Sequence, residues 1–166
     1  MSAGVQWHRE PAPGRILAID PGSKRSAVVE FSAGEPGNHG IVENDELVDR
    51  FLGRGLLLDE SIVCEWMAPR GMPTSADELE TCYWVGRFVQ ALSPATVHRL
   101  TRHKIKLAIC GNARANDVNI RAALIDRFGG KEAAIGLKKT PGPLYGFAGD
   151  EWAALAVALA YADGAR

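Results

Sequence analysis

The sequence has few cysteines and no long apolar run, and both shortages exclude classes of protein. Its three cysteines, Cys64, Cys82 and Cys110, are odd in number and widely spaced in apolar surroundings. We therefore expect buried, reduced thiols in a cytoplasmic protein rather than disulfides or a cysteine-based metal site. No stretch approaches the roughly 18 apolar residues of a membrane span. Residues 1–14 lack the apolar core of a secretory signal.

Internal repeats, low-complexity tracts and signs of a second domain are also missing. The chain has 166 residues, of which 46% are apolar and 23% charged. That length is sufficient to bury about two thirds of the unfolded surface in one core. Pro11, Pro13 and Gly14 lie among charged residues near the start. We therefore expect residues 1–14 to form a flexible leader and residues 15–166 to form one domain.

The net charge is close to zero, but the charges are unevenly distributed along the chain. Residues 99–139 hold ten basic and three acidic side chains, a local charge of +7. The remainder holds nine basic and seventeen acidic side chains, a charge of −8. This asymmetry favours a surface that binds a polyanion. Ordinary solvated helix faces produce the same pattern, so both interpretations stay open at this point.

Hydrophobic patterning predicts an α/β domain that begins with three strands. The predicted strands are residues 15–20, 26–32, 40–43, 61–65 and 104–110. The predicted helices are residues 45–52, 75–92, 117–128 and 150–162. Gly, Pro and Asn residues predict a turn at 34–40 and loops at 66–74 and 136–149.

Two of these helices carry specific signals. Ser75 and Glu78 form a capping box at the start of the second helix. Its apolar stripe, with a period of roughly 3.6 residues, consists of Leu79, Cys82, Gly86, Val89 and Leu92. The last helix is apolar on most sides and is therefore expected inside the domain.

Three carboxylates lie where predicted elements meet loops. Asp20 ends the first strand, Glu65 ends the fourth, and Asp150 opens the last helix. Acids in such places can converge on one point of an α/β fold. Convergent carboxylates without basic partners repel one another unless a divalent cation lies between them. The pattern therefore indicates a divalent metal site.

Each acid also has a structural explanation. Asp20 suits an Asp-Pro-Gly turn, and Asp150 and Asp117 suit the N-caps of the helices that they begin. Glu65 is harder to explain, because it follows three apolar residues and an unpaired buried carboxylate is costly. The joint occurrence of Asp20, Glu65 and Asp150 favours a functional site, whereas we expect Asp117 to be a plain N-cap.

Several of these segments resemble the RuvC family of Holliday-junction resolvases, in the RNase H-like superfamily. The similar segments are Leu17-Ala18-Ile19-Asp20-Pro21-Gly22, Val63-Cys64-Glu65 and Asp150 followed by the alanine-rich residues 153–158. Residues 110–115 and 119–130 are similar to the phage-encoded branch of that family. The resemblance covers most of residues 15–162. It implies an RNase H-like five-stranded mixed sheet flanked by helices, with the acids gathered at one sheet end to hold Mg²⁺.

The activity implied by the resemblance is metal-dependent cleavage of four-way DNA junctions. Two Mg²⁺ ions, about 3.5–4 Å apart, neutralise the phosphate while water attacks, and Mn²⁺ is expected to substitute. Asp20 is the candidate for bridging both ions, Glu65 for binding one and Asp150 for binding the other. The expected products carry a 5′-phosphate and a 3′-hydroxyl. We expect no nucleotide cofactor and no membrane partner.

Two positions depart from the family pattern. The bacterial resolvases carry a further acid where this chain has Ala153. Glu151 is a candidate replacement ligand, but it points about 100° away around the helix unless the helix begins late. Several relatives also carry a lysine where this chain has Asn116. One metal ligand and one phosphate contact therefore differ from the family.

Basic and aromatic residues around the loops are candidates for binding branched DNA. They are Lys104, Lys106, Arg114, Arg121, Lys138, Lys139 and Tyr145. The two lysines at 138 and 139 precede the last helix closely and are expected near the scissile phosphate. Tyr145, Phe147 or Trp66 could stack on an unpaired base, although such aromatics also serve as loop anchors. A junction has near-twofold symmetry and needs two nicks, which implies a homodimer.

Alternatives from other classes stay open. An RNase of the same fold would act on precursor ribosomal RNA. A non-catalytic module would bind junctions without cutting them, because Ala153 leaves the acid set incomplete. An actin-like ATPase also begins with a strand and Asp-x-Gly, but that architecture needs two such domains.

Overall fold

The core of the protein is a five-stranded mixed sheet. The computed structural model describes residues 14–53, 60–69 and 71–166, so nearly all of the predicted leader lies outside the described residues. The strands are β1 (Arg15–Asp20), β2 (Arg25–Ser32), β3 (Glu35–Glu43), β4 (Glu60–Trp66) and β5 (Val97–Thr101). Their order in the sheet is β3-β2-β1-β4-β5. Strand β4 pairs in parallel with both β1 and β5, so these three strands end at the same edge of the sheet.

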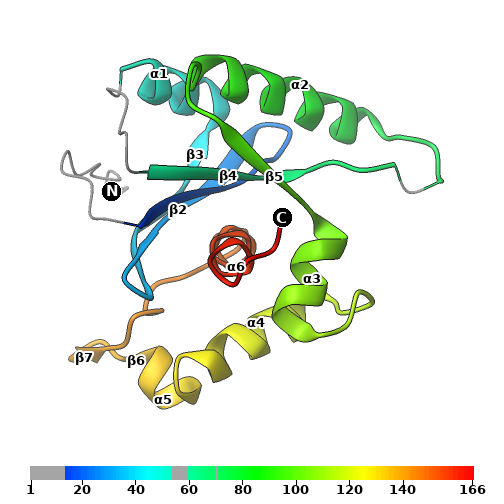
Figure 1. Ribbon diagram of the computed structural model, residues 1–166. Coiled ribbons are helices and arrows are strands. Elements are labelled where there is room, and N and C mark those ends of the chain that lie inside the picture. Colours follow the sequence, from blue (N-terminus) through cyan, green and yellow to red (C-terminus); the bar gives the residue numbers. More distant parts are fainter. Residues whose placement is uncertain (1–13, 54–59, 70) are drawn as a thin grey trace.

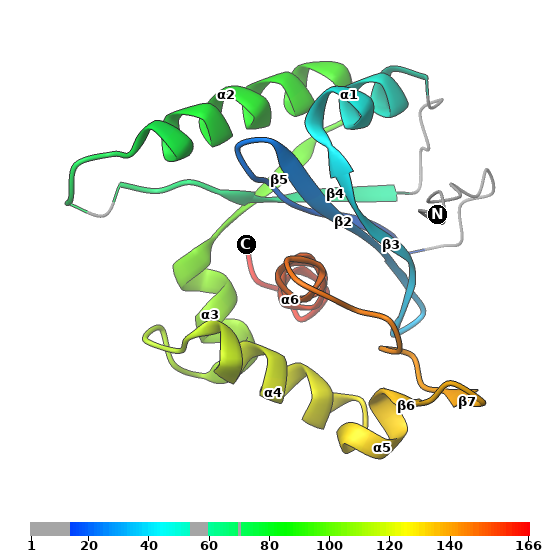
Figure 2. The same cartoon turned by 180° about the vertical axis from the view of Figure 1, so that it is seen from behind.

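Helices cover both faces of the sheet. They are α1 (Asn44–Gly53), α2 (Ala76–Ala91), α3 (Arg102–Cys110), α4 (Asp117–Arg127), α5 (Gly130–Ala134) and α6 (Glu151–Ala162). Figures 1 and 2 show α1 and α2 on one face and α6 on the other, with α3, α4 and α5 beyond α6. A small hairpin of β6 (Gly136–Leu137) and β7 (Thr140–Pro141) follows α5. Helix α6 is therefore enclosed, which confirms the position expected from its apolar sequence.

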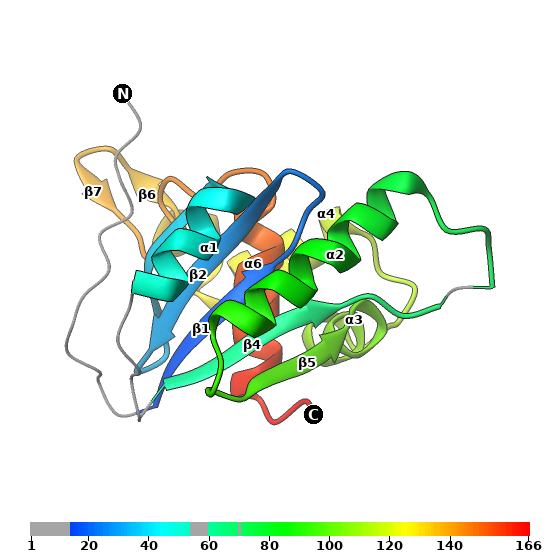
Figure 3. The ribbon, with the colours of Figure 1, turned by 90° about the horizontal axis from the view of Figure 1, so that it is seen from above.

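The alternation of side chains along β1 determines the face of the sheet on which its last residue, Asp20, lies. Leu17 and Ile19 belong to the core beneath α1 and α2, whereas Ile16 and Ala18 belong to the core around α6. Side chains alternate between the two faces of a strand, so Asp20 lies on the α6 side. The same alternation in β4 places Val63 in the α6 core, and Glu65 follows on that side. Figure 3 shows β1 and β4 running side by side across α6.

The fifth strand predicted at residues 104–110 is wrong, because those residues belong to helix α3. The fifth strand is β5, just before it. Thr101 caps the helix by accepting a hydrogen bond from the Lys104 amide, and Gly111 ends it in a left-handed conformation with φ of 63°. Alternation was misleading here, because Ile105 is buried but Leu107 is about half exposed.

Helix α2 has the predicted capping box at Ser75, and of the predicted apolar stripe Leu92 is buried in the core, whereas most of the stripe is not. The side chains that it buries are those of Thr81, Trp84, Val85 and Phe88. Leu79 and Cys82 of the predicted stripe are exposed, so the expectation of a buried thiol at position 82 is also wrong. The helix therefore has a second apolar stripe that faces away from the sheet.

Two smaller differences concern β3 and the cysteines. Strand β3 begins at Glu35, within the predicted turn, because the reversal is already made at Ala33 and Gly34. Pro36 fits into this strand because β3 is at the edge of the sheet. All three cysteines are free, as expected. No helix in the described part of the chain is long and apolar enough to cross a membrane.

Candidate active site

The carboxylates of Asp20 and Glu65 come together because β1 and β4 are parallel neighbours. Ile19 pairs with Cys64 in the register of these strands, so the next residue of each strand lies at the same edge. Asp150 reaches this point from the start of α6 and lines a cavity of about 120 Å³ together with Asp20. Asp20 thus neighbours Glu65 along the strand edge and Asp150 in the cavity wall, and the metal site expected from the three acids stays a prediction.

The neighbours of Asp20 determine how readily its carboxyl group ionises. Burial raises the pKa of Asp20 well above its ordinary value, and the negative charges of Glu65 and Asp150 raise it further. A hydrogen bond with Glu65 acts in the same direction, whereas Arg102 opposes the shift. A carboxylate placed beside two others resists ionisation. A cation at this point would relieve that repulsion.

Hydrogen bonding argues against two of the structural explanations. In the described residues no backbone N–H donates to the Asp20 carboxylate, as an aspartate that only stabilises its own turn would require. Asp150 occupies the N-cap position of α6, but its side chain makes no capping hydrogen bond. Neither carboxylate is therefore used to hold the backbone of its own turn or helix start.

Other side chains hold the turn that follows Asp20. Asn44 and Ser26, both nearly fully buried, form a hydrogen bond of 2.7 Å between Ser26 Oγ and Asn44 Oδ1. Asn44 Nδ2 donates to the Gly22 carbonyl, and the Gly22 amide donates to Ser26 Oγ. A Cβ at Gly22 would lie 2.4 Å from the Arg25 carbonyl oxygen, so only glycine fits this close approach. The turn is thus fixed without using Asp20.

Arg102 contradicts the expectation that these acids have no basic partner. Its Nη1 donates to Glu65 Oε2 at 3.1 Å, and its Nη2 binds Asp117 Oδ1. Asp117 was expected to be an N-cap, but Asn116 caps α4 and Asp117 is the first helical residue. Arg102 and Asp117 also line the cavity. In the sequence, Arg102 is distinguished only as one of the ten basic residues between positions 99 and 139.

Glu151 lies outside this group. Its carboxylate is buried and lies 2.9 Å from Nδ1 of His39 on β3, while the Ala148 amide donates to its other oxygen. The helix begins at Glu151 rather than late, so the condition under which Glu151 would replace the ligand missing at Ala153 is not met. Ala153 itself lines the cavity and contributes no charge there.

The predicted DNA-binding residues are spread around the domain. Arg114 and Arg121 are exposed, and Arg121 lies over Trp152, which lines the cavity. On α3, Lys106 is half-buried, and Lys104 is exposed and donates to the backbone of Arg166.

Lys138 and Lys139 form the exposed tip of the β6-β7 hairpin, at the outer edge of the molecule in both opposite views (Figures 1 and 2). In the loop that follows, Tyr145 is exposed, but Phe147 is buried and stacks on His39. Trp66 is half-buried and lies against Arg99. Phe147 is therefore a loop anchor.

The chain resembles solved structures, although no protein-family model and no curated protein sequence matches it. One similar structure is RuvC of Thermus thermophilus, with a TM-score of 0.59 and 17% identity over 90% of this chain and 93% of that chain. Another is T. thermophilus RuvC in complex with a Holliday junction substrate, with a TM-score of 0.62 and 18% identity over 92% of this chain and 94% of that chain. The chain therefore has the RuvC-like fold of the RNase H type, a five-stranded mixed sheet flanked by helices.

Proposed function

We propose that the protein is a metal-dependent, structure-selective endonuclease that cleaves four-way DNA junctions. The observation that carries this proposal is the convergence of Asp20, Glu65 and Asp150 at one sheet end, where burial and mutual repulsion raise the pKa of Asp20. The same fold is found in a RuvC bound to a Holliday junction substrate. The similarity of residues 110–115 further leads us to propose the phage-type branch of the family, and the three free cysteines fit a reducing cytoplasm.

The donor set of the site fits Mg²⁺ or Mn²⁺, which bind carboxylate oxygens. In the described residues no three acidic, histidine or cysteine side chains are already close enough to enclose an ion. Glu65 is instead turned towards Arg102, so this carboxylate would have to exchange partners. When bound, two such ions would neutralise the phosphate and activate the attacking water. We propose Asp20 as the ligand shared by both ions, Glu65 as a ligand of one and Asp150 as a ligand of the other.

The protein itself would hold and orient the substrate. The Ser26 and Asn44 hydrogen bonds fix the turn beside Asp20, and Trp152 and Ile120 give the cavity an apolar wall. Arg121 on α4 is exposed over Trp152, which lines the cavity, and Arg114 is exposed in the loop before α4. Both can neutralise phosphates without selecting sequence. Hydrolysis would leave a 5′-phosphate and a 3′-hydroxyl.

The direct test is incubation of the purified protein with a labelled four-way junction, a matched duplex and an RNA. We expect cleavage of the junction alone, with Mg²⁺ or Mn²⁺ and not with chelator. Preferential cleavage of the RNA would favour the ribosomal RNA alternative. Junction binding without cleavage under every metal condition would favour the non-catalytic alternative, to which Ala153 lends some support by lining the cavity without a charge.

The hairpin tip gives a prediction about DNA binding. Replacing Lys138 and Lys139 together by alanine should weaken junction binding and lower its log–log salt slope by one to two, because each lost phosphate contact removes about 0.9. Binding isotherms at several salt concentrations measure this slope. Lys131→Ala, an exposed lysine on α5, is the control and should change it little. An unchanged slope in the double variant would mean that the hairpin does not touch the DNA backbone.

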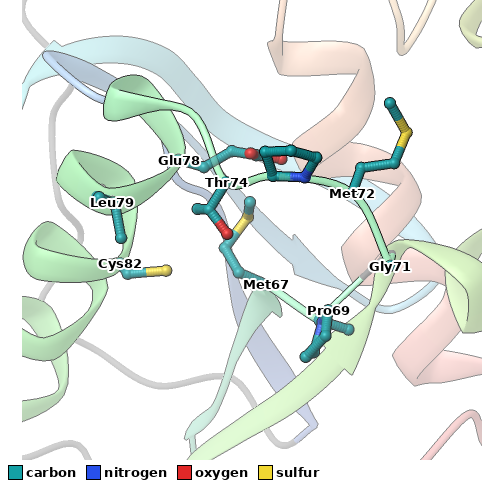
Figure 4. A pocket seen from close by; sticks show the side chains of 10 residues that line it. Met67, Pro69, Gly71, Met72, Thr74, Glu78, Leu79 and Cys82 are labelled. Carbon is teal, nitrogen blue, oxygen red and sulfur yellow. The ribbon is translucent and has the colours of Figure 1, made fainter.

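The outer stripe of α2 suggests where two copies meet. Leu79 and Tyr83 are exposed on this helix, one turn apart, and Met72 is exposed in the preceding loop. Beside the helix is an open groove of about 600 Å³, lined by Met67, Met72, Leu79 and Cys82 among others (Figure 4). An exposed apolar helix face next to a groove is a common site of association. Because a junction is nearly twofold symmetric, we propose a homodimer that packs α2 against its copy.

Two charges on this stripe should prevent dimer formation. We expect the Leu79→Glu and Tyr83→Glu double variant to be monomeric by size-exclusion chromatography with light scattering, with little loss of protomer stability because both side chains are exposed. Leu107→Glu alters an equally exposed leucine on α3 and should leave the dimer intact. A dimeric double variant, or a monomeric control, would argue against this interface.

A further inference from the structure

Arg102 is a permanent positive charge among the carboxylates of the candidate site. It donates to Glu65 at 3.1 Å, binds Asp117 and lines the same cavity as Asp20 and Asp150. Burial disfavours its charge, but Glu65, Asp117 and Asp20 outweigh burial and raise its pKa. A guanidinium does not lose its proton in proteins. The site therefore contains one built-in cation before any metal ion binds.

The fold, rather than local helix preference, places this charge. Glu65 lies near the end of β4, and Arg102 directly follows the end of the neighbouring parallel strand β5. The last paired residues of these two strands are Trp66 and Thr101. Arg102 is the first residue of α3, a position where the helix dipole disfavours a cation. Its carboxylate partners must therefore compensate for that position.

The two partners of Arg102 differ in exposure. The Glu65 side chain is 12% exposed, whereas that of Asp117 is 82% exposed. An ion pair with a largely buried carboxylate is the stronger one, because water screens it less. Glu65 is thus the partner that Arg102 meets inside the site, and Asp117 anchors the other edge of the guanidinium at the rim of the cavity.

We propose that Arg102 is the resident counter-ion of this site and competes with the divalent cation for Glu65. It holds the Glu65 carboxylate in place in the metal-free protein through their ion pair. It yields this carboxylate when the metal ion binds, and Asp117 retains the guanidinium beside the site. This inference rests on the proposed metal dependence and assigns Arg102 as a positioning residue for Glu65.

The test measures metal binding rather than cleavage. Arg102→Gln removes the competing charge, so Mn²⁺ alone should bind the variant on the order of tenfold more tightly than the wild type in isothermal titration calorimetry. In chelator the variant should melt at a lower temperature than the wild type, because Glu65 has lost its partner. Saturating Mg²⁺ should close most of that gap, since metal binding stabilises the folded state.

A purely structural role for Arg102 predicts a different result. Arg102→Gln would then melt at a lower temperature by the same amount with and without Mg²⁺, and its Mn²⁺ affinity would equal that of the wild type; either result would overturn the proposal. Arg127→Gln is the matched control, because it breaks a bidentate ion pair with Asp163 that lies outside the site. It should leave Mn²⁺ affinity unchanged.

Two further outcomes are informative. Arg102→Lys keeps a cation with a different shape, and its Mn²⁺ affinity should lie between those of the wild type and Arg102→Gln. If Arg102→Gln does not fold, Arg102→Lys is the variant to compare with the wild type. A wild-type protein that binds no Mn²⁺ and cleaves no junction would overturn the proposed function together with this inference. A wild type that binds Mn²⁺ and cleaves, with an Arg102→Gln variant of equal affinity, would overturn this inference alone.

Discussion

Asp20→Asn is expected to abolish junction cleavage while leaving junction binding intact or stronger. Asp20 neighbours Glu65 across the paired strands and shares the cavity wall with Asp150, and it is our candidate for the ligand shared by both ions. Asparagine keeps the shape of the side chain but removes the charge that divalent cations require. Loss of one group that stabilises transition-state charge typically costs about 10²–10³-fold in rate, and loss of a shared ligand should cost at least as much.

Cleavage rates and binding isotherms on the same labelled junction check this prediction. Asp49→Asn, an exposed aspartate on α1, serves as the control and should cleave like the wild type. Undiminished cleavage by Asp20→Asn would remove Asp20 from the mechanism. Loss of junction binding would mean instead that the substitution disturbs the DNA surface.

The raised pKa of Asp20 adds a stability measurement to the same variant. The folded protein holds a proton on Asp20 more tightly than the unfolded chain, whose aspartates titrate near the ordinary value of 3.8. Without metal, the free energy of unfolding therefore falls as the pH rises from that value through the raised pKa. Asparagine cannot ionise and escapes this loss. In chelator at neutral pH, Asp20→Asn should melt at a higher temperature than the wild type, and the difference should disappear at pH values below 3.8.

The sequence was sufficient to predict that Asp20 and Glu65 lie at one end of the sheet, but not that a basic side chain lies beside them. Apolar strands that end in Asp20 and Glu65 predict the convergence, because parallel strands end at one edge. Arg102 was missed for a single reason, the placement of the fifth strand at residues 104–110. With the strand at Val97–Thr101, Arg102 follows a strand end beside Glu65, and the ion pair becomes predictable.

The two faces of α2 show a different limit. A 3.6-residue period identified a genuine apolar stripe, but the helix has two, and the stripe of Trp84, Val85 and Phe88 packs on the sheet. Periodicity in one helix does not show which of two stripes meets the protein's own core. The exposed stripe is then the more informative one about association, because the protein's own core does not cover it.

Asp150→Asn should lose nearly all cleavage, whereas Glu151→Gln should retain most of it. The two acids are neighbours, yet Asp150 lines the cavity without a capping bond, while Glu151 is held by His39 and the Ala148 amide on another side of α6. Asp150→Asn therefore removes charge from the site, and the same rate assay should show a loss of roughly 10²-fold or more.

The expected cost of Glu151→Gln is in stability rather than in rate. The single acceptor oxygen of glutamine can keep the bond from the Ala148 amide, but its NH2 group can bond His39 only if the imidazole presents Nδ1 as an acceptor. We expect this change of partner to cost about 1 kcal/mol of unfolding free energy. Thermal or denaturant unfolding measures this loss. Asp150→Asn should show no comparable destabilisation, because its carboxylate makes no capping hydrogen bond.

Ala153→Asp provides a gain of function at the same helix end. Position 153 is on the cavity side, one turn after Asp150, and a carboxylate there would restore the acid of the RuvC-type resolvases. We expect the variant to fold and to reach half-maximal cleavage at a lower Mg²⁺ concentration, because a further oxygen ligand offsets the charge of Arg102. If Glu151→Gln were inactive and Asp150→Asn active, the ligand would be one residue later, and α6 would have to turn by about 100° to present it.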